Sequence, residues 1–123
     1  MGLLSGILGH GRGVDVGEVT KELEGVLLPS ETVEVGFRTV RDLIVFTTKR
    51  MILVDKQGIT GRKVEYLSVP YRAINAFSVE TAGTFDMEAE LKIWVSGLPG
   101  PVQRTLSRGT DIKAIQAAIA SIL

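Results

Sequence analysis

The sequence predicts an α+β, mainly β domain, in which about seven antiparallel strands form a partly open barrel between an N-terminal helix and a C-terminal capping helix. Two observations predict this class. Apolar residues follow a helical spacing before residue 28 and after residue 111, and they alternate in steps of two in between. The alternating runs number about seven, and a strictly antiparallel barrel of seven strands needs a gap, which a helix can close.

The first 13 residues read as a flexible or short helical arm, and residues 14–123 as a single domain. Apolar residues at helical spacing in the arm are followed by a glycine-rich break at residues 9–13. Asp15 is then positioned as an N-cap, and the apolar stripe that begins at Val16 predicts a helix that reaches Leu27. Pro29 is expected to end that helix.

The alternating part of the chain is divided by turn signals into short runs. The predicted strands span residues 33–38, 43–47, 50–55, 64–69, 74–80, 87–96 and 102–106. The runs 43–47 and 50–55 are apolar on both faces, so one face should meet the barrel core and the other a helix or another subunit. A closing helix follows from Ile112, with Thr110 or Asp111 as its N-cap.

Composition excludes several functions. A length of 123 residues suits one domain, and a net charge of zero argues against electrostatic binding of nucleic acid while leaving self-association unopposed. The chain has no cysteine, which rules out disulfides, thiolate catalysis and Cys-ligated zinc. It also lacks an apolar run of the roughly 20 residues that a membrane span needs. We therefore expect a cytoplasmic protein.

Longer motifs carry a family resemblance. The stretches 47–66, 69–71, 77–86 and 90–97 resemble the bacterial pleckstrin-homology (PH) domain family, and the likeness extends over nearly all of the chain from Val14. The resemblance implies a PH-like barrel of two sheets with a terminal helix, and no particular biochemical activity. It also implies a homo-oligomeric ring, with a pentamer expected. The first hairpin connection, residues 38–42, is too short for the basic pocket of lipid-binding eukaryotic relatives.

Residues able to carry catalysis are few. His10 is the single histidine and lies in the glycine-rich arm, without a Ser-His-Asp arrangement or a zinc-ligand set. Asp86, Glu88 and Glu90 could meet a cation, although such a row is more often the solvated face of a sheet. We expect no enzyme activity, no cofactor and no metal.

Charge is segregated along the chain, with cations in the central strands and carboxylates in the next hairpin. Opposite charges on different edges favour a head-to-tail subunit contact, whereas an anionic headgroup site and ordinary solvated turns remain alternatives for the cations. Trp94 is either an interface anchor or packed under the N-terminal helix. The predicted interface residues are Lys49, Arg50, Arg62, Lys63, Glu80, Asp86, Glu88, Glu90 and Trp94.

The sequence therefore predicts a non-enzymatic PH-like binding or scaffold module that forms a ring with copies of itself, with another protein as a further candidate partner. The alternative is a peripheral membrane adaptor. It would bind anionic lipid headgroups through the basic central strands, with residues 1–8 as an amphipathic contact.

Overall fold

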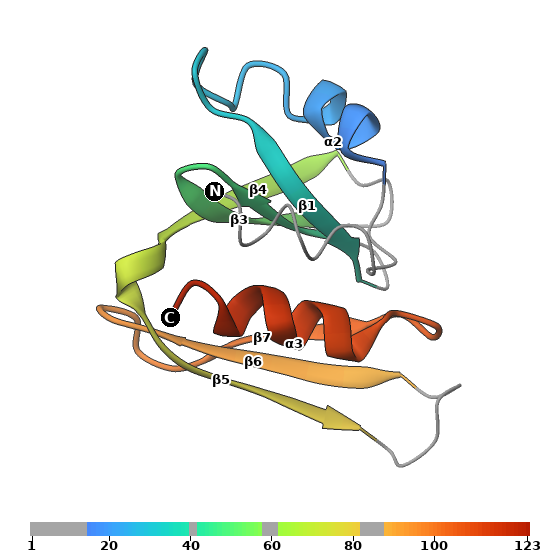
Figure 1. The fold of residues 1–123 in the computed structure, drawn as a ribbon, viewed down its shortest axis with the longest axis vertical. Coiled ribbons are helices and arrows are strands. Elements are labelled where there is room, and N and C mark those ends of the chain that lie inside the picture. Colours follow the sequence, from blue (N-terminus) through green and yellow to red (C-terminus); the bar gives the residue numbers. More distant parts are fainter. Residues whose placement is uncertain (1–14, 40–41, 58–61, 82–87) are drawn as a thin grey trace.

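A computed structural model describes residues 15–39, 42–57, 62–81 and 88–123 (Figure 1). The elements are α2 (Val16–Glu22), β1 (Val33–Arg38), β2 (Leu43–Thr47), β3 (Arg50–Gln57), β4 (Lys63–Pro70), the 3-10 turn η1 (Tyr71–Ala73), β5 (Ile74–Thr81), β6 (Ala89–Val95), β7 (Val102–Leu106) and α3 (Ile112–Ala120). The predicted α+β class, with seven antiparallel strands and helices at both ends, is confirmed.

The strands form two antiparallel sheets, ordered β1-β2-β3-β4 and β5-β6-β7 (Figure 1). The chain passes from the first sheet to the second through η1, and a single bridge between Thr39 and Leu106 joins them at the far side. α3 lies between the two sheets. The barrel is thus partly open, and within the described ranges β4 is paired on one side only.

The main core fills the space between the sheets and α3. It combines inward side chains of the first sheet, such as Phe37 and Phe46, with Leu91 of β6 and with Ile115 and Ile119 of α3, all essentially inaccessible to solvent. The two phenylalanine rings meet edge to face, with centroids 6.3 Å apart. Asp111 is the N-cap of α3, because its side chain accepts from the Ala114 amide at 3.1 Å.

A second, outer core lies on the other face of the first sheet. Val19 of α2 and Leu23, the C-cap of that helix, pack on outward side chains of β2 and β3. These include Val45 and Ile52, and all four residues are fully buried. This explains why these two strands are apolar on both faces. Of the two expected covers for the outer face, the structure has the chain's own helix rather than another subunit.

The predicted extent of the first helix is wrong. Its N-cap is Asp15 as predicted, accepting from the Gly17 amide at 2.8 Å, but α2 ends at Glu22 rather than Leu27. The residues beyond it turn instead, and Gly25 has φ 86°, a conformation that glycine adopts without strain. The predicted arm of residues 1–13 lies outside the described residues.

The turn between β2 and β3 forms without glycine or proline. The hydroxyl of Thr47 accepts from the amides of Lys49 and Arg50, both at 3.0 Å, so a side chain supplies the acceptor that closes the turn.

None of the helices in the described ranges has the length and apolar character needed to cross a membrane.

Candidate functional site

A buried ion pair lies beside the turn between β2 and β3. The side chain of Glu31, just before β1, is completely buried, and Arg50 at the start of β3 contacts both of its carboxylate oxygens. Nε donates to Oε2 at 2.9 Å and Nη2 donates to Oε1 at 2.9 Å. This bidentate geometry is the strongest arrangement of the two groups and fixes the guanidinium plane.

Further donors complete the environment of Glu31. The Thr47 hydroxyl donates to Oε2 at 2.6 Å and the Leu28 amide donates to Oε1 at 3.1 Å. The hydrogen bond from Arg50, helped by those from Thr47 and Leu28 and by the charge of Arg50, lowers the pKa of Glu31 to about 2, against the opposing effect of burial. Glu31 is therefore ionised at neutral pH, and the pair carries no net charge.

Arg50 also joins three parts of the fold. Its Nη2 donates to the carbonyl oxygen of Val26 at 2.8 Å, and its Nη1 donates to Ser68 Oγ on β4 at 2.7 Å. Four of its five N–H groups are thus used within the chain. Although predicted as an interface cation, Arg50 is engaged in an internal contact whose partner is 19 residues away. No local sequence pattern signals such a pairing.

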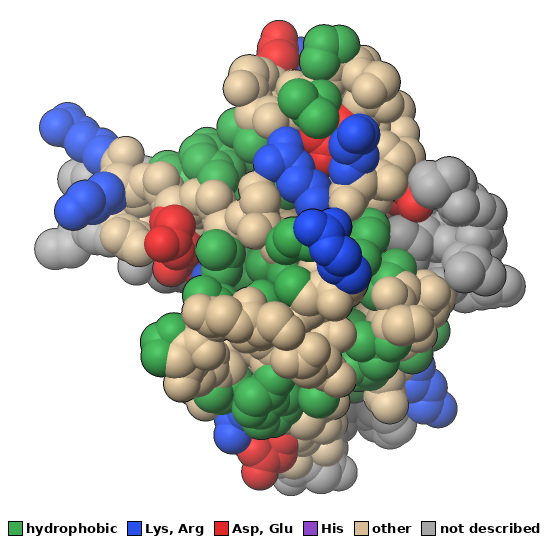
Figure 2. Space-filling view, turned by 90° about the vertical axis from the view of Figure 1, so that its left-hand side faces the viewer, with side chains coloured by type: hydrophobic (Ala, Val, Ile, Leu, Met, Phe, Trp, Pro, Cys, Tyr) green, Lys and Arg blue, Asp and Glu red, His purple; other side chains and the backbone are tan. Residues whose placement is uncertain are grey.

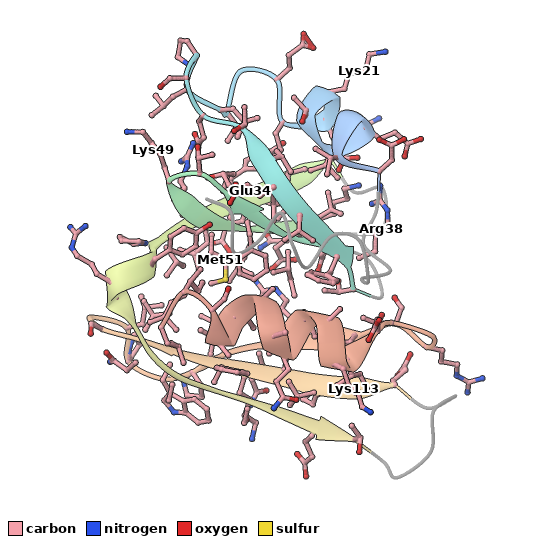
Figure 3. All side chains as sticks on the ribbon, in the orientation of Figure 1. Lys21, Glu34, Arg38, Lys49, Met51 and Lys113 are labelled. Atoms are coloured by element: carbon pink, nitrogen blue, oxygen red, sulfur yellow. The ribbon has the colours of Figure 1, made fainter. Side chains whose placement is uncertain are left out.

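A groove of about 370 Å³ lies beside the ion pair, and we call it the Arg50 groove. Its lining residues are Val26, Leu28, Lys49, Arg50, Ser68 and Pro70. Figure 2 shows this side of the molecule, where Lys and Arg side chains gather around acidic atoms and next to hydrophobic side chains. Lys49 is exposed and extends from the turn into solvent (Figure 3).

The predicted basic residues fall in two separate places. Arg50 faces Pro70 at one end of the β3–β4 hairpin, whereas Lys63 faces Gln57 at the other end. Arg62 and Lys63 are exposed, and within the described residues neither makes an ion pair. The central strands therefore carry two small basic sites instead of one continuous basic surface.

The predicted acidic residues that the structure describes do come together. Glu80 on β5 lies directly opposite Glu90 on β6, and both line a groove of about 390 Å³ with Glu88, Thr81, Ala89 and Thr105. The Thr105 hydroxyl donates to Glu90 at 2.9 Å. Asp86, the fourth predicted carboxylate, lies outside the described residues.

Trp94 lies on the same outward face of β6 as Glu90, since the strand alternates buried and outward residues. Trp94 is 38% exposed, and both described helices pack elsewhere, α2 on the first sheet and α3 between the sheets. We call the outward surface formed by Glu80, Glu88, Glu90 and Trp94 the acidic sheet face. Of the two interpretations of Trp94, the exposed one fits the described residues.

What these sites offer is charge, hydrogen bonds and apolar contact. Across the ranges that the structure describes, no three His, Cys, Asp or Glu side chains are grouped so that they could hold a metal ion. His10 falls outside those ranges.

Tyr71 is a partly buried titratable residue next to the turn between β2 and β3. Burial, with a smaller effect from the charge of Glu34, raises the pKa of Tyr71 above its ordinary value, and its hydroxyl donates to the Thr47 carbonyl oxygen.

Comparison with known proteins matches nearly the whole chain to one protein family. Residues 2–123 match the family described as Bacterial PH domain. The chain is 50% identical over 123 residues to the Bacillus subtilis (strain 168) protein named "Uncharacterized protein YjqA", covering 99% of this chain and 98% of that protein.

Two crystal structures are similar in both sequence and fold. One is a pleckstrin homology domain from Shewanella amazonensis SB2B, with 51% identity, a TM-score of 0.80, and coverage of 97% of this chain and 96% of that one. The other is a DUF1696 family protein with a pleckstrin-homology domain from Shewanella loihica PV-4. It has 51% identity, a TM-score of 0.74, and coverage of 89% and 94%.

Proposed function

The chain belongs to the bacterial PH domain family, and from this premise we propose that it acts in the cytoplasm as a non-enzymatic binding and scaffold module that assembles with itself, head to tail, into a closed ring. A five-membered ring is the expectation from the family resemblance. The observation that carries the proposal is the acidic sheet face, where a large aromatic side chain and paired carboxylates share an outward surface.

The acidic sheet face has the chemistry of an interface. Exposed tryptophan is a frequent anchor of protein contacts, because it buries a large apolar area and loses little side-chain entropy. Glu80 and Glu90 lie directly opposite each other, and like charges in that position repel. A partner surface that brings cations to this pair would relieve the repulsion and cover the indole at the same time.

A second copy of the chain can supply those cations. Arg62 and Lys63 are exposed neighbours at the start of β4, on a different edge of the molecule from β5 and β6. Because the two surfaces are different, the contact is heterologous, and a heterologous contact closes into a ring when its rotation allows. Two adjacent cations facing two adjacent carboxylates would also set the register of the contact.

The test is the mass in solution, measured by light scattering coupled to size exclusion. Wild type should run as a multiple of 13.3 kDa, and the double variant Glu80→Lys with Glu90→Lys should run as a single chain. Adding Arg62→Glu and Lys63→Glu to that variant exchanges the charges on both sides and should restore the assembly. A monomeric wild type, or a double variant of unchanged mass, would refute the ring.

The membrane adaptor is the competing function, and the separation of the basic sites weighs against it. Lipid headgroups are bound best by several cations on one surface, whereas here Lys49 stands apart from Arg62 and Lys63, and Arg50 is neutralised by Glu31. Co-sedimentation with phosphatidylglycerol vesicles at low and high salt distinguishes the two functions. Salt-sensitive vesicle binding by a monomeric chain would replace the ring with the adaptor.

A further inference from the structure

The Arg50 groove is separate from both surfaces that the ring would use. It lies at the end of the β3–β4 hairpin opposite Arg62 and Lys63, and none of its lining residues belongs to the acidic sheet face. We propose that this groove binds an extended acidic peptide segment of another protein, in which a carboxylate side chain is next to an apolar one. The proposal is independent of the ring and goes beyond it.

The apolar side of the groove is unusually accessible. Leu28 is 49% exposed, beside the half-buried Val26 and the exposed Pro70. The same outward face of β4 continues to Tyr66, which is 43% exposed, because residues 66, 68 and 70 alternate with inward ones. Burying these side chains against an apolar residue of a ligand would remove apolar surface from water and so favour the complex.

The charge of the groove matches a single carboxylate. Glu31 cancels the charge of Arg50, and Lys49, for which the described residues offer no ion pair, is the cation left over. A phosphate group, with nearly twice the charge, would find only this one uncompensated cation. A peptide carboxylate is therefore the better match to these lining residues.

Arg50 adds a donor that is already in place. Its contacts with Glu31, Val26 and Ser68 use four of five N–H groups and leave one Nη1 hydrogen beside the groove. Because these contacts fix the guanidinium, a ligand that accepts from it loses little additional side-chain entropy on binding. Arg50 would orient the carboxylate, and Lys49 would supply the net charge.

The position of β4 favours an extended chain as the ligand. Among the described residues, β4 is the edge strand of the four-stranded sheet and is paired only with β3. Its other edge therefore presents backbone groups that a peptide strand can follow. Pro70 has no N–H and marks where such pairing stops. The volume of about 370 Å³ is within the usual range of roughly 300–1,000 Å³ for small binding sites.

The experiment is an NMR titration of the 15N-labelled full chain with the peptide acetyl-Ser-Leu-Glu-Phe-Ser-amide, beside a matched peptide with glutamine in place of glutamate. We expect the amide signals of Leu28, Lys49 and Ser68 to shift and saturate. The glutamine peptide should bind about tenfold more weakly, since it loses a charge-assisted contact. Lys49→Glu should weaken binding of the glutamate peptide similarly. The control Lys113→Glu, at an exposed lysine on α3 outside both the groove and the proposed ring contact, should leave the peptide affinity unchanged.

Three results would overturn the proposal. These are no saturable shift with the glutamate peptide, equal binding of the two peptides, or equal effects of Lys49→Glu and Lys113→Glu on the peptide affinity. Binding to phosphatidylglycerol vesicles that Lys49→Glu abolishes, with no peptide binding, would assign the groove to membranes instead. The mass of each variant distinguishes this proposal from the ring, because Lys49→Glu should leave the assembly intact.

Discussion

The outer faces of the two sheets differ in composition and in what covers them. The outer face of β2 and β3 is apolar and lies under α2 (Figure 1). The outer face of β6 instead carries Glu90, Lys92 and Trp94, and both described helices pack elsewhere. Both sheets contribute their inner faces to one main core. The comparison shows that the outward residues of a strand indicate whether the chain supplies its own cover. The exposed aromatic among charges on β6 is where the proposed ring contact would form.

The largest difference between the two faces should be in stability. Leu23→Ala, at the C-cap of α2, removes a fully buried side chain from the outer core, and we expect the free energy of unfolding to fall by about 3 kcal/mol. Trp94→Ala on the outward face of β6 should cost less than Leu23→Ala in a monomeric background, about 1–2 kcal/mol, because Trp94 is 38% exposed and its removal leaves no closed cavity. Urea denaturation of both variants measures the two values. Equal losses would mean that the second sheet is covered as well.

The second-largest difference in stability should be between neutralising the buried carboxylate of Glu31 and neutralising the more exposed carboxylate of Glu90. Glu31→Gln leaves Arg50 without its charged partner, and we expect a loss of about 2–3 kcal/mol at pH 7. Glu90→Gln, on the acidic sheet face, keeps the acceptor for the Thr105 hydroxyl and should change the stability by less than about 0.5 kcal/mol in a monomeric background. Chemical denaturation at pH 7 compares the two.

The stability contribution of the buried Glu31 should also depend on pH. Since folding lowers the pKa of Glu31 from 4.5 to about 2, its contribution is fully present above pH 4.5 and is lost as the pH falls through about 2. The gap in stability between wild type and Glu31→Gln should therefore be constant from pH 7 to pH 5 and shrink towards pH 2. A gap that widens on acidification would contradict the ion pair.

The smallest expected effect concerns the facing carboxylates of the second sheet. Glu80→Gln removes the repulsion with Glu90, so a chain made monomeric by Arg62→Glu and Lys63→Glu should become more stable by about 0.2–0.5 kcal/mol. In the wild-type background the same change should weaken the ring, since it removes one anion from the contact. Thermal unfolding and mass measurements together check the opposite signs.

Much of the fold could be predicted because strands are set by local alternation. Six strands begin and end within two residues of their predicted limits. The seventh is β6, whose predicted first residue, 87, lies outside the described residues. The helix α2 was extended too far because its apolar stripe continues through Val26 and Leu27, while the backbone turns at Gly25. A periodic pattern records which side chains are buried, and turns as well as helices can bury them.

The candidate site could be predicted only in part. Glu80 and Glu90 were expected on one surface, and strand pairing places them opposite each other. The basic residues were expected together, but the hairpin separates Lys49 from Lys63 by the full length of β3. Arg50 was interpreted as a surface cation, because its partner Glu31 lies on another element and is brought to it only by the packing of the sheet.

The amino-acid sequence by itself determined the order of the elements, the two faces of each strand and the absence of thiol chemistry, because these depend on neighbouring residues or on composition. Only the tertiary structure decided that α2 covers the first sheet, that Glu31 neutralises Arg50, and that a groove opens between Leu28 and Pro70. Each of these joins residues distant in the chain, and their contacts arise from the way the sheets, α2 and α3 pack around the cores.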